Sequence, residues 1–279
     1  MTTGKINLPD DIEIATGSNP RDLVILSPPK CGKGTVLGAL TRERNAIVFD
    51  LERDGYEFIS ARKISIYDNH LTDFVTAYNN YINYRDALLE NKGKYEYLII
   101  DPITDLDTMS EYGGTLMYMY TNPQGKNFNR EIIAGKLTGR IYQYGEPEFK
   151  TVHDIGEGYG YKHSREWFLQ QIELFAQISP YRIYSGHISD KLLHNAATKE
   201  EVTGTEIALT GKLKRIFASK VTTIGKMIVD GTKRYLSFLV ENDNIIAGSR
   251  APKLKDKILL SDMVDGELQT YWENIYETK

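Results

Sequence analysis

Short apolar runs alternate with longer, helix-like segments through the first two thirds of the chain. The runs have the length of buried strands and cover residues 23–26, 46–51, 97–100 and 181–185. Between them, helices are expected at residues 35–44, 71–89 and 164–178, where apolar positions favour packing by one face. Strands that alternate with helices form βαβ units, so the pattern predicts an α/β fold with a mostly parallel sheet flanked by helices.

Two internal segments lack this pattern. Residues 110–162 are rich in Gly, Tyr and Asn and have weak periodicity. We expect them to form an inserted or mobile excursion rather than core. Residues 189–204 are expected to form a polar loop.

The C-terminal third predicts a β-hairpin. Residues 221–229 and 234–240 flank Asp230 and Gly231, which form a strong two-residue turn signal. A further short strand is expected at residues 245–247, and the end of the chain predicts a short helix.

The length of 279 residues fits one elaborated domain. We expect a flexible arm at residues 1–20, an α/β domain at 21–257 that contains the excursion 110–162, and a tail at 258–279. The apolar share of 41% is sufficient for a sizeable core. No run approaches the roughly 18 apolar residues that cross a bilayer, and no secretory signal is visible. Because Cys31 is the single cysteine, an internal disulfide is excluded, and a cytoplasmic protein without membrane contact is expected.

Charge is distributed unevenly. The net charge of −4 argues against a simple basic coat protein for nucleic acid, yet residues 212–257 carry eleven Lys and Arg against four Asp and Glu, a local balance of +7. The best local cluster is Lys212, Lys214 and Arg215. This stretch predicts either a footprint for a polyanion or ordinary solvated faces, and both interpretations remain open.

A phosphate-binding loop follows the first strand. The sequence Ser27-Pro-Pro-Lys-Cys-Gly-Lys-Gly-Thr35 is close to G-x-x-x-x-G-K-[ST], with Ser27 in place of the first glycine and Gly34 in place of the metal-binding hydroxyl. Gly32 allows successive backbone N–H groups to point at phosphate oxygens, Lys33 supplies a cation, and the next helix adds its positive end. The residues expected to bind ATP are Pro29, Lys30, Cys31, Gly32, Lys33, Gly34 and Thr35.

Lys33, Gly34 and Thr35 also resemble the loop ending of adenylate-kinase-type proteins. Thr35 is therefore expected either to hold an α-phosphate or to serve a Mg²⁺ ion. The alternative interpretation of the whole segment is a Pro/Gly turn between a strand and a helix.

Acidic and imidazole side chains follow three further strands. Asp101 ends residues 97–100 and is expected to hold Mg²⁺, usually through water. Glu52 follows the second strand and could deprotonate a water beside the γ-phosphate, and His187 follows the fourth and could bond the γ-phosphate or that water. Because the carboxyl ends of parallel strands share one edge, these residues should meet there.

With these strand ends, residues 23–252 resemble RecA/RadA-like recombinase ATPases, and most closely the small phage-encoded RecA-fold proteins associated with single-strand annealing. Asp50-x-Glu52 resembles the I-D-x-E of that class, whose glutamate is the catalytic base. Gly186-His187 falls where the family has a γ-phosphate sensor. The resemblance implies a DNA-facing loop at about residues 188–214 and, if phage-encoded, a location in the host cytoplasm.

Ala247-Gly248-Ser249-Arg250 resembles the family's Lys-Asn-Arg segment, which reaches the nucleotide of the neighbouring subunit. Arg250 matches the arginine, and Gly248 stands where the lysine would be. The resemblance therefore implies a homo-oligomer in which Arg250 acts in trans on the transferring phosphoryl group.

Three functions are consistent with the sequence. The first is an ATP- and Mg²⁺-dependent ATPase that acts on single-stranded DNA in recombination, annealing or repair. The second is a nucleotide or small-molecule kinase, although residues 110–162 contain only Arg130 and Arg140 for an arginine-rich lid. The third is a nucleotide-binding module with little turnover, which the departures at Ser27 and Gly34 permit.

Overall fold

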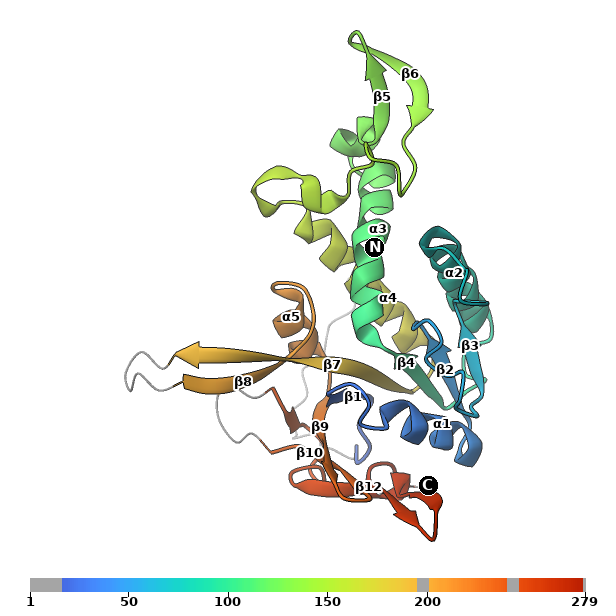
Figure 1. Cartoon of the computed structure of the whole chain (residues 1–279), viewed down its shortest axis with the longest axis vertical. Helices are drawn as coiled ribbons and strands as arrows, with labels where there is room; N and C mark the ends of the chain where they lie inside the picture. The colour runs from blue at the N-terminus through green and yellow to red at the C-terminus, as the bar shows by residue number, and fades with distance from the viewer. Residues whose placement is uncertain (1–16, 195–200, 240–245, 278–279) are drawn as a thin grey trace, which may run out of the picture.

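The computed structural model describes residues 17–194, 201–239 and 246–277 and contains a three-layer α/β core (Figure 1). Parallel strands form one side of an 11-stranded sheet, in the order β9-β1-β7-β4-β2-β3, with β3 at the edge. Their bounds are β1 Asp22–Ser27, β2 Ala46–Asp50, β3 Lys63–Ser65, β4 Tyr97–Asp101, β7 Tyr181–His194 and β9 Thr223–Asp230. The predicted α/β fold, with a mostly parallel sheet flanked by helices, is confirmed.

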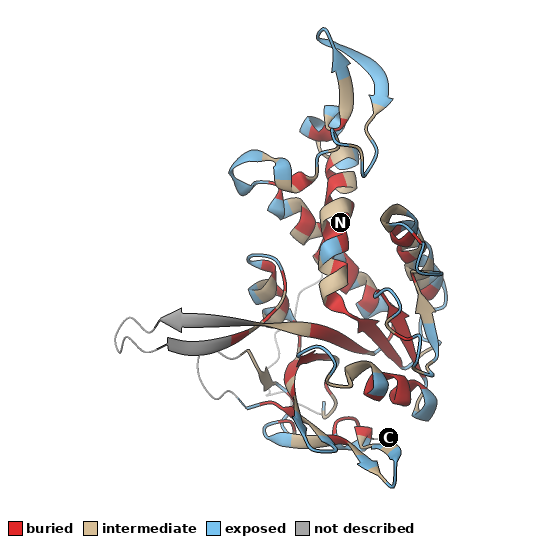
Figure 2. Cartoon of the chain, viewed as in Figure 1, coloured by how far each residue is buried: buried red, intermediate tan, exposed pale blue. Residues whose placement is uncertain are grey.

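The central strands are buried on both faces (Figure 2). Successive side chains of a strand point to opposite sides of the sheet, so each strand contributes to two cores. In β1, Val24 and Leu26 belong to one hydrophobic core, and Leu23 and Ile25 belong to the other. The first core includes side chains of α2 Phe74–Glu90, α3 Ile103–Thr121, α4 Tyr161–Ile178 and α5 Leu213–Lys220. The second includes side chains of α1 Lys33–Glu43 and of the C-terminal segment.

The first part of the predicted excursion is helical rather than irregular. α3 runs through residue 121 and packs against α4. A Cβ atom on Gly113 would lie 2.3 Å from Cε2 of Trp167, and one on Gly114 would lie 2.7 Å from the backbone N of Ser164. The glycines that weaken the helical pattern in the sequence are therefore places where the two helices approach closely.

The rest of the excursion extends away from the sheet. A 3-10 turn at Pro123–Asn127 leads into a separate hairpin of β5 Arg130–Ile133 and β6 Lys136–Ile141, at the top of Figure 1. Two further 3-10 turns, Val152–Asp154 and Gly156–Gly158, return the chain to α4.

The prediction of a polar loop at residues 189–204 is wrong over its described part. β7 continues to His194 and pairs in antiparallel fashion with β8 Glu201–Ile207, from Ile188 opposite Ile207 to His194 opposite Glu201. The ribbon projects to the left in Figure 1. Residues 189–194 and 201–207 carry no regular alternation of apolar positions, which is why the sequence does not predict these strands.

The predicted C-terminal hairpin is confirmed: β9 pairs with β10 Lys233–Ser237, with Lys233 opposite Asp230. The strand expected at 245–247 lies partly outside the described residues, and the structure has β11 Gly248–Ser249 beside β9 instead. Where the sequence predicts a tail, β12 Lys257–Val264 and β13 Glu267–Thr270 extend the sheet, and a 3-10 turn follows at Trp272–Asn274.

Most of the predicted N-terminal arm, residues 1–16, lies outside the described part of the chain. Within the described residues, no helix combines the length and the apolar character that crossing a membrane requires.

Candidate nucleotide-binding site

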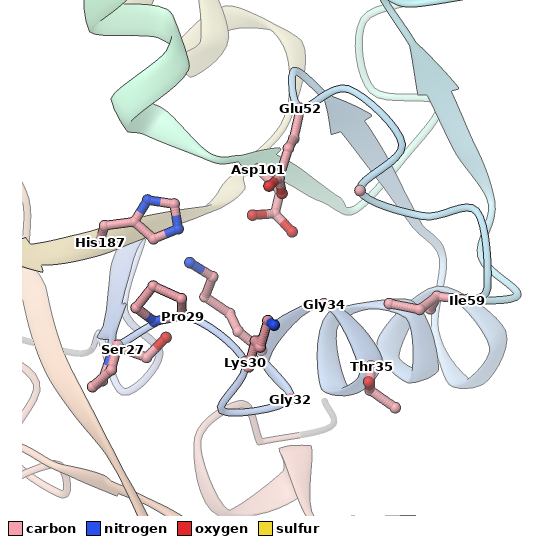
Figure 3. A pocket seen from close by; sticks show the side chains of 13 residues that line it. Ser27, Pro29, Lys30, Gly32, Gly34, Thr35, Glu52, Ile59, Asp101 and His187 are labelled. Carbon is pink, nitrogen blue, oxygen red and sulfur yellow. The ribbon is translucent and has the colours of Figure 1, made fainter. Parts of the chain in front are cut away.

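The carboxyl ends of β1, β2 and β4 meet the middle of β7 around a cavity of about 430 Å³ (Figure 3). Six of the seven predicted phosphate-binding residues line it, with Cys31 as the exception. Glu52, Asp101 and His187 line it as well. The sheet edge therefore brings together the strand-end residues that the sequence predicts, at the place where ligands bind in open parallel sheets.

The loop before α1 has the shape of an anion-binding turn. Lys30 and Gly32 have left-handed backbone conformations, with φ of 63° and 82°. Gly32 is the N-cap of α1 and Lys33 is its first residue, so the positive end of the helix faces the cavity. Ser27 also lines the cavity, and its buried hydroxyl has no hydrogen-bond partner among the described residues. A phosphate oxygen could supply that partner.

Arg234 stabilises this loop from outside the cavity. Its Nε donates to the carbonyl oxygen of Cys31 at 2.9 Å. The guanidinium lies so close that a Cβ atom on Gly32 would be 2.5 Å from Nε. The sequence gives no signal for this role, because Arg234 lies in the β10 strand of a hairpin and only the sheet order brings β10 near the loop.

Lys33 lies among the acidic groups of the cavity. Its Nζ donates to the carbonyl oxygen of Gly186 at 3.4 Å. Burial lowers the pKa of Lys33, and the negative charges of Asp101 and Glu52 oppose that change. Burial and the charge of Asp101 raise the pKa of Glu52, while Lys33 lowers it. A carboxylate with a raised pKa is a stronger base, so Glu52 suits the role of activating a water.

Asp101 is held in a fixed orientation by two hydroxyl groups. The hydroxyl of Tyr56 donates to Oδ2 at 2.6 Å, and that of Ser185, on the neighbouring strand β7, donates to Oδ1. The Asp101 residue is only 5% exposed. Tyr56 is a second residue that the sequence did not reveal, because it follows β2 in a loop with no recognisable motif.

A protein-only metal cage is absent from the described residues, where no group of three or more His, Cys, Asp or Glu could hold an ion. Mg²⁺ does not need such a cage, because it commonly takes one or two carboxylates together with phosphates and water. Asp101, with Glu52 beside it, fits that donor set (Figure 3). Thr35 and Asp101 line the same cavity, but Thr35 is exposed and its side chain points away from Asp101 in Figure 3.

His187 continues β7 and directs its ring into the cavity (Figure 3). Its Nδ1 lies 3.3 Å from the hydroxyl of Thr104, at the start of α3. Burial and the positive charge of Lys33 lower the pKa of His187. The imidazole is therefore neutral at pH 7 and can hydrogen-bond a phosphate or a water.

Arg250 is not near the cavity of its own chain. It is exposed, and its Nη2 donates to the carbonyl oxygen of Ser219 at 3.0 Å. The preceding residue, Ser249, pairs with Thr223, which pairs with Leu23 at the start of β1. Arg250 therefore lies at the amino ends of the parallel strands, whereas the phosphate loop lies at their carboxyl ends. Its action in trans stays a prediction.

The described basic residues of the stretch 212–257 do not form one continuous patch. Arg234 turns to the phosphate loop, Lys214 pairs with Glu206, and Lys253 lies 3.2 Å from Glu277. Lys212 and Arg215, at the start of α5, are exposed.

The sheet order, the phosphate loop and the strand-end acids define a P-loop nucleotide-binding protein. A family model described as an AAA domain matches residues 19–251, and the chain belongs to that family. This places it in the superfamily of AAA and P-loop ATPases. No curated protein matches the sequence.

Proposed function

We propose that the chain is an ATP hydrolase that requires Mg²⁺ and acts on single-stranded DNA as a homo-oligomer. The observation that supports hydrolysis best is the convergence on one cavity of four residues from different elements: Lys33 at the start of α1, Glu52 after β2, Asp101 at the end of β4 and His187 within β7. These are the parts that phosphoryl transfer to water needs: a cation, a base, a metal-binding carboxylate and a polar group near the γ-phosphate.

The geometry supports a separate task for each residue. Lys33 and the backbone N–H groups of the loop bind the phosphates. Glu52 accepts the proton of the attacking water, and neutral His187 orients that water or the γ-phosphate. Asp101 would hold Mg²⁺, which neutralises charge on the phosphates when it is bound.

The involvement of DNA is supported by the β7–β8 ribbon. His187 and the ribbon belong to one continuous strand, so a ligand on the ribbon and a nucleotide in the cavity would contact the same element. The ribbon and the exposed Lys212 fall within residues 188–214, where the resemblance to RecA-like proteins implies a DNA-facing segment, and the exposed Arg215 directly follows that segment. Contacts of Lys and Arg with DNA phosphates would weaken as salt increases.

Hydrolysis of ATP by the purified protein, with and without single-stranded DNA at low and moderate salt, tests the proposal. We expect stimulation by DNA and loss of turnover in Lys33→Ala and Glu52→Gln. Glu57→Gln, an exposed position in the same loop that does not line the cavity, is the matched control and should retain activity. Turnover that is indifferent to DNA would refute the DNA-coupled mechanism.

The two alternatives make different predictions. A kinase would need arginines over the phosphates, yet no arginine of the described residues lines the cavity, and Arg140 is paired with Glu131 and Glu146 in the distant hairpin. A binding module with little turnover would show the same low rate in wild type and in Glu52→Gln.

A further inference from the structure

Gly34 leaves the loop without a hydroxyl at the position that usually carries Ser or Thr, and the space beside it is filled by other residues. A Cβ atom on Gly34 would lie 3.1 Å from Cδ1 of Ile59, 3.8 Å from Cζ of Tyr56 and 3.9 Å from its hydroxyl oxygen. Both residues come from the segment between β2 and β3. The hydroxyl oxygen of Tyr56 thus lies 3.9 Å from the place that Cβ of the usual Ser or Thr would occupy.

The hydroxyl of Tyr56 is fixed at this place. The residue is 3% exposed and belongs to the core that includes α1. Its hydroxyl donates to Oδ2 of Asp101 at 2.6 Å. Tyr56 therefore joins the phosphate loop to the metal-binding carboxylate.

We propose that Tyr56 is a positioning residue for the metal ion, and that its hydroxyl replaces the missing hydroxyl of the phosphate loop by orienting Asp101. This inference rests on the proposed function, since it concerns the Mg²⁺ ion that accompanies ATP. Asp101 keeps its second partner, Ser185, when the Tyr56 hydroxyl is removed. The loss should therefore affect the orientation of the carboxylate rather than its presence in the cavity.

The test is the affinity of Mn²⁺, a spectroscopic probe for Mg²⁺, for the protein saturated with a non-hydrolysable ATP analogue. Removing a group that orients a metal ligand typically weakens metal binding by about 10- to 100-fold. We expect Tyr56→Phe to weaken Mn²⁺ binding about 10-fold. Affinity for the nucleotide in the presence of a chelator should change less than about twofold, because Tyr56 does not line the cavity.

Tyr81→Phe is the matched control. Tyr81 is also a buried tyrosine with one hydroxyl bond, to Gln171 Oε1 at 3.0 Å, in the opposite core. It should leave Mn²⁺ affinity unchanged. Equal Mn²⁺ affinity in wild type and Tyr56→Phe, or equal losses in Tyr56→Phe and Tyr81→Phe, would overturn the inference.

A second variant tests the replacement itself. Gly34→Ser combined with Tyr56→Phe returns a hydroxyl to the loop, and the contact it meets is the end of the flexible Ile59 side chain. We expect the double variant to regain most of the Mn²⁺ affinity that Tyr56→Phe loses. If it regains none, the Tyr56 hydroxyl does not replace the missing hydroxyl of the loop. Wild-type protein that binds no ATP would overturn the proposed function together with this inference, whereas normal ATP hydrolysis with unaltered metal binding in Tyr56→Phe would overturn the inference alone.

Discussion

Replacing Gly32 by alanine should damage the phosphate loop in two ways. Gly32 has φ of 82°, a left-handed conformation that costs an L-residue about 1 to 2 kcal/mol. In addition, the new Cβ atom would lie 2.5 Å from Nε and 2.7 Å from Nη2 of Arg234. The guanidinium would have to move, and its hydrogen bond to the carbonyl oxygen of Cys31 would be lost.

The two effects can be given magnitudes. A hydrogen bond from a charged donor contributes about 1.5 to 3 kcal/mol. Together with the backbone term, Gly32→Ala should destabilise the loop by about 2.5 to 5 kcal/mol. If most of this free energy is required to form the phosphate-binding conformation, affinity for ATP should fall by about 100-fold.

Gly93→Ala separates the two effects. Gly93 has φ of 78°, but no atom lies within 4 Å of the position of its Cβ. It should lose only the backbone term, about 1 to 2 kcal/mol in the free energy of unfolding measured by denaturant titration. Its affinity for ATP should equal that of wild type. In an Arg234→Ala background, Gly32→Ala should cost no more than Gly93→Ala does.

The reasoning fails if Gly32→Ala and Gly93→Ala lose equal stability and neither alters ATP affinity, measured by titration with a fluorescent analogue. That result would mean that Arg234 does not stabilise the loop. It would leave the left-handed turn as the single requirement at this position.

Three further predictions concern pH and packing. Burial, and to a smaller extent the charges of Glu52 and Asp101, raise the pKa of Asp105 to about 7. Between about pH 4 and pH 7 the folded protein therefore binds more protons at Asp105 than the unfolded protein does, so the free energy of unfolding should fall as pH rises through this range. Asp105→Asn should flatten that decline in denaturant titrations at pH 5 and 8, and an unchanged slope would contradict the assignment. Gly113→Ala should lower the free energy of unfolding by about 2 to 3 kcal/mol, because its Cβ collides with Trp167; an effect below about 0.5 kcal/mol would contradict close packing of α3 on α4. Trp272→Ala should cost about 3 to 5 kcal/mol, because the side chain is fully buried, and a loose tail would show almost no loss.

The sequence predicts the strand-end residues of the site well. Glu52, Asp101 and His187 each follow an apolar run of the sequence, and Lys33 opens the helix after the first run; a parallel sheet places these positions together. These residues can be found because their position depends on local pattern and on one rule of topology.

Other parts of the site depend on contacts that no local pattern encodes. Tyr56 reaches Asp101 from a loop, and Arg234 reaches the phosphate loop from a hairpin at the far side of β9. In the sequence, Gly113 weakens the prediction of a helix; in the structure, it is the residue of α3 against which Trp167 packs. Long-range packing decides each of these cases, and a single sequence does not show which distant residues will become neighbours.

The location of Arg250 restricts how copies of this chain can associate. The arginine lies at the amino ends of the parallel strands, and the cavity lies at their carboxyl ends. A two-fold dimer uses the same patch on both subunits, so one such interface could not contain both the arginine and the cavity. If Arg250 completes a neighbour's site, subunits must therefore associate head to tail, in a closed ring or a filament. An open filament would then always retain one terminal cavity without its arginine, whereas a ring would complete all of them.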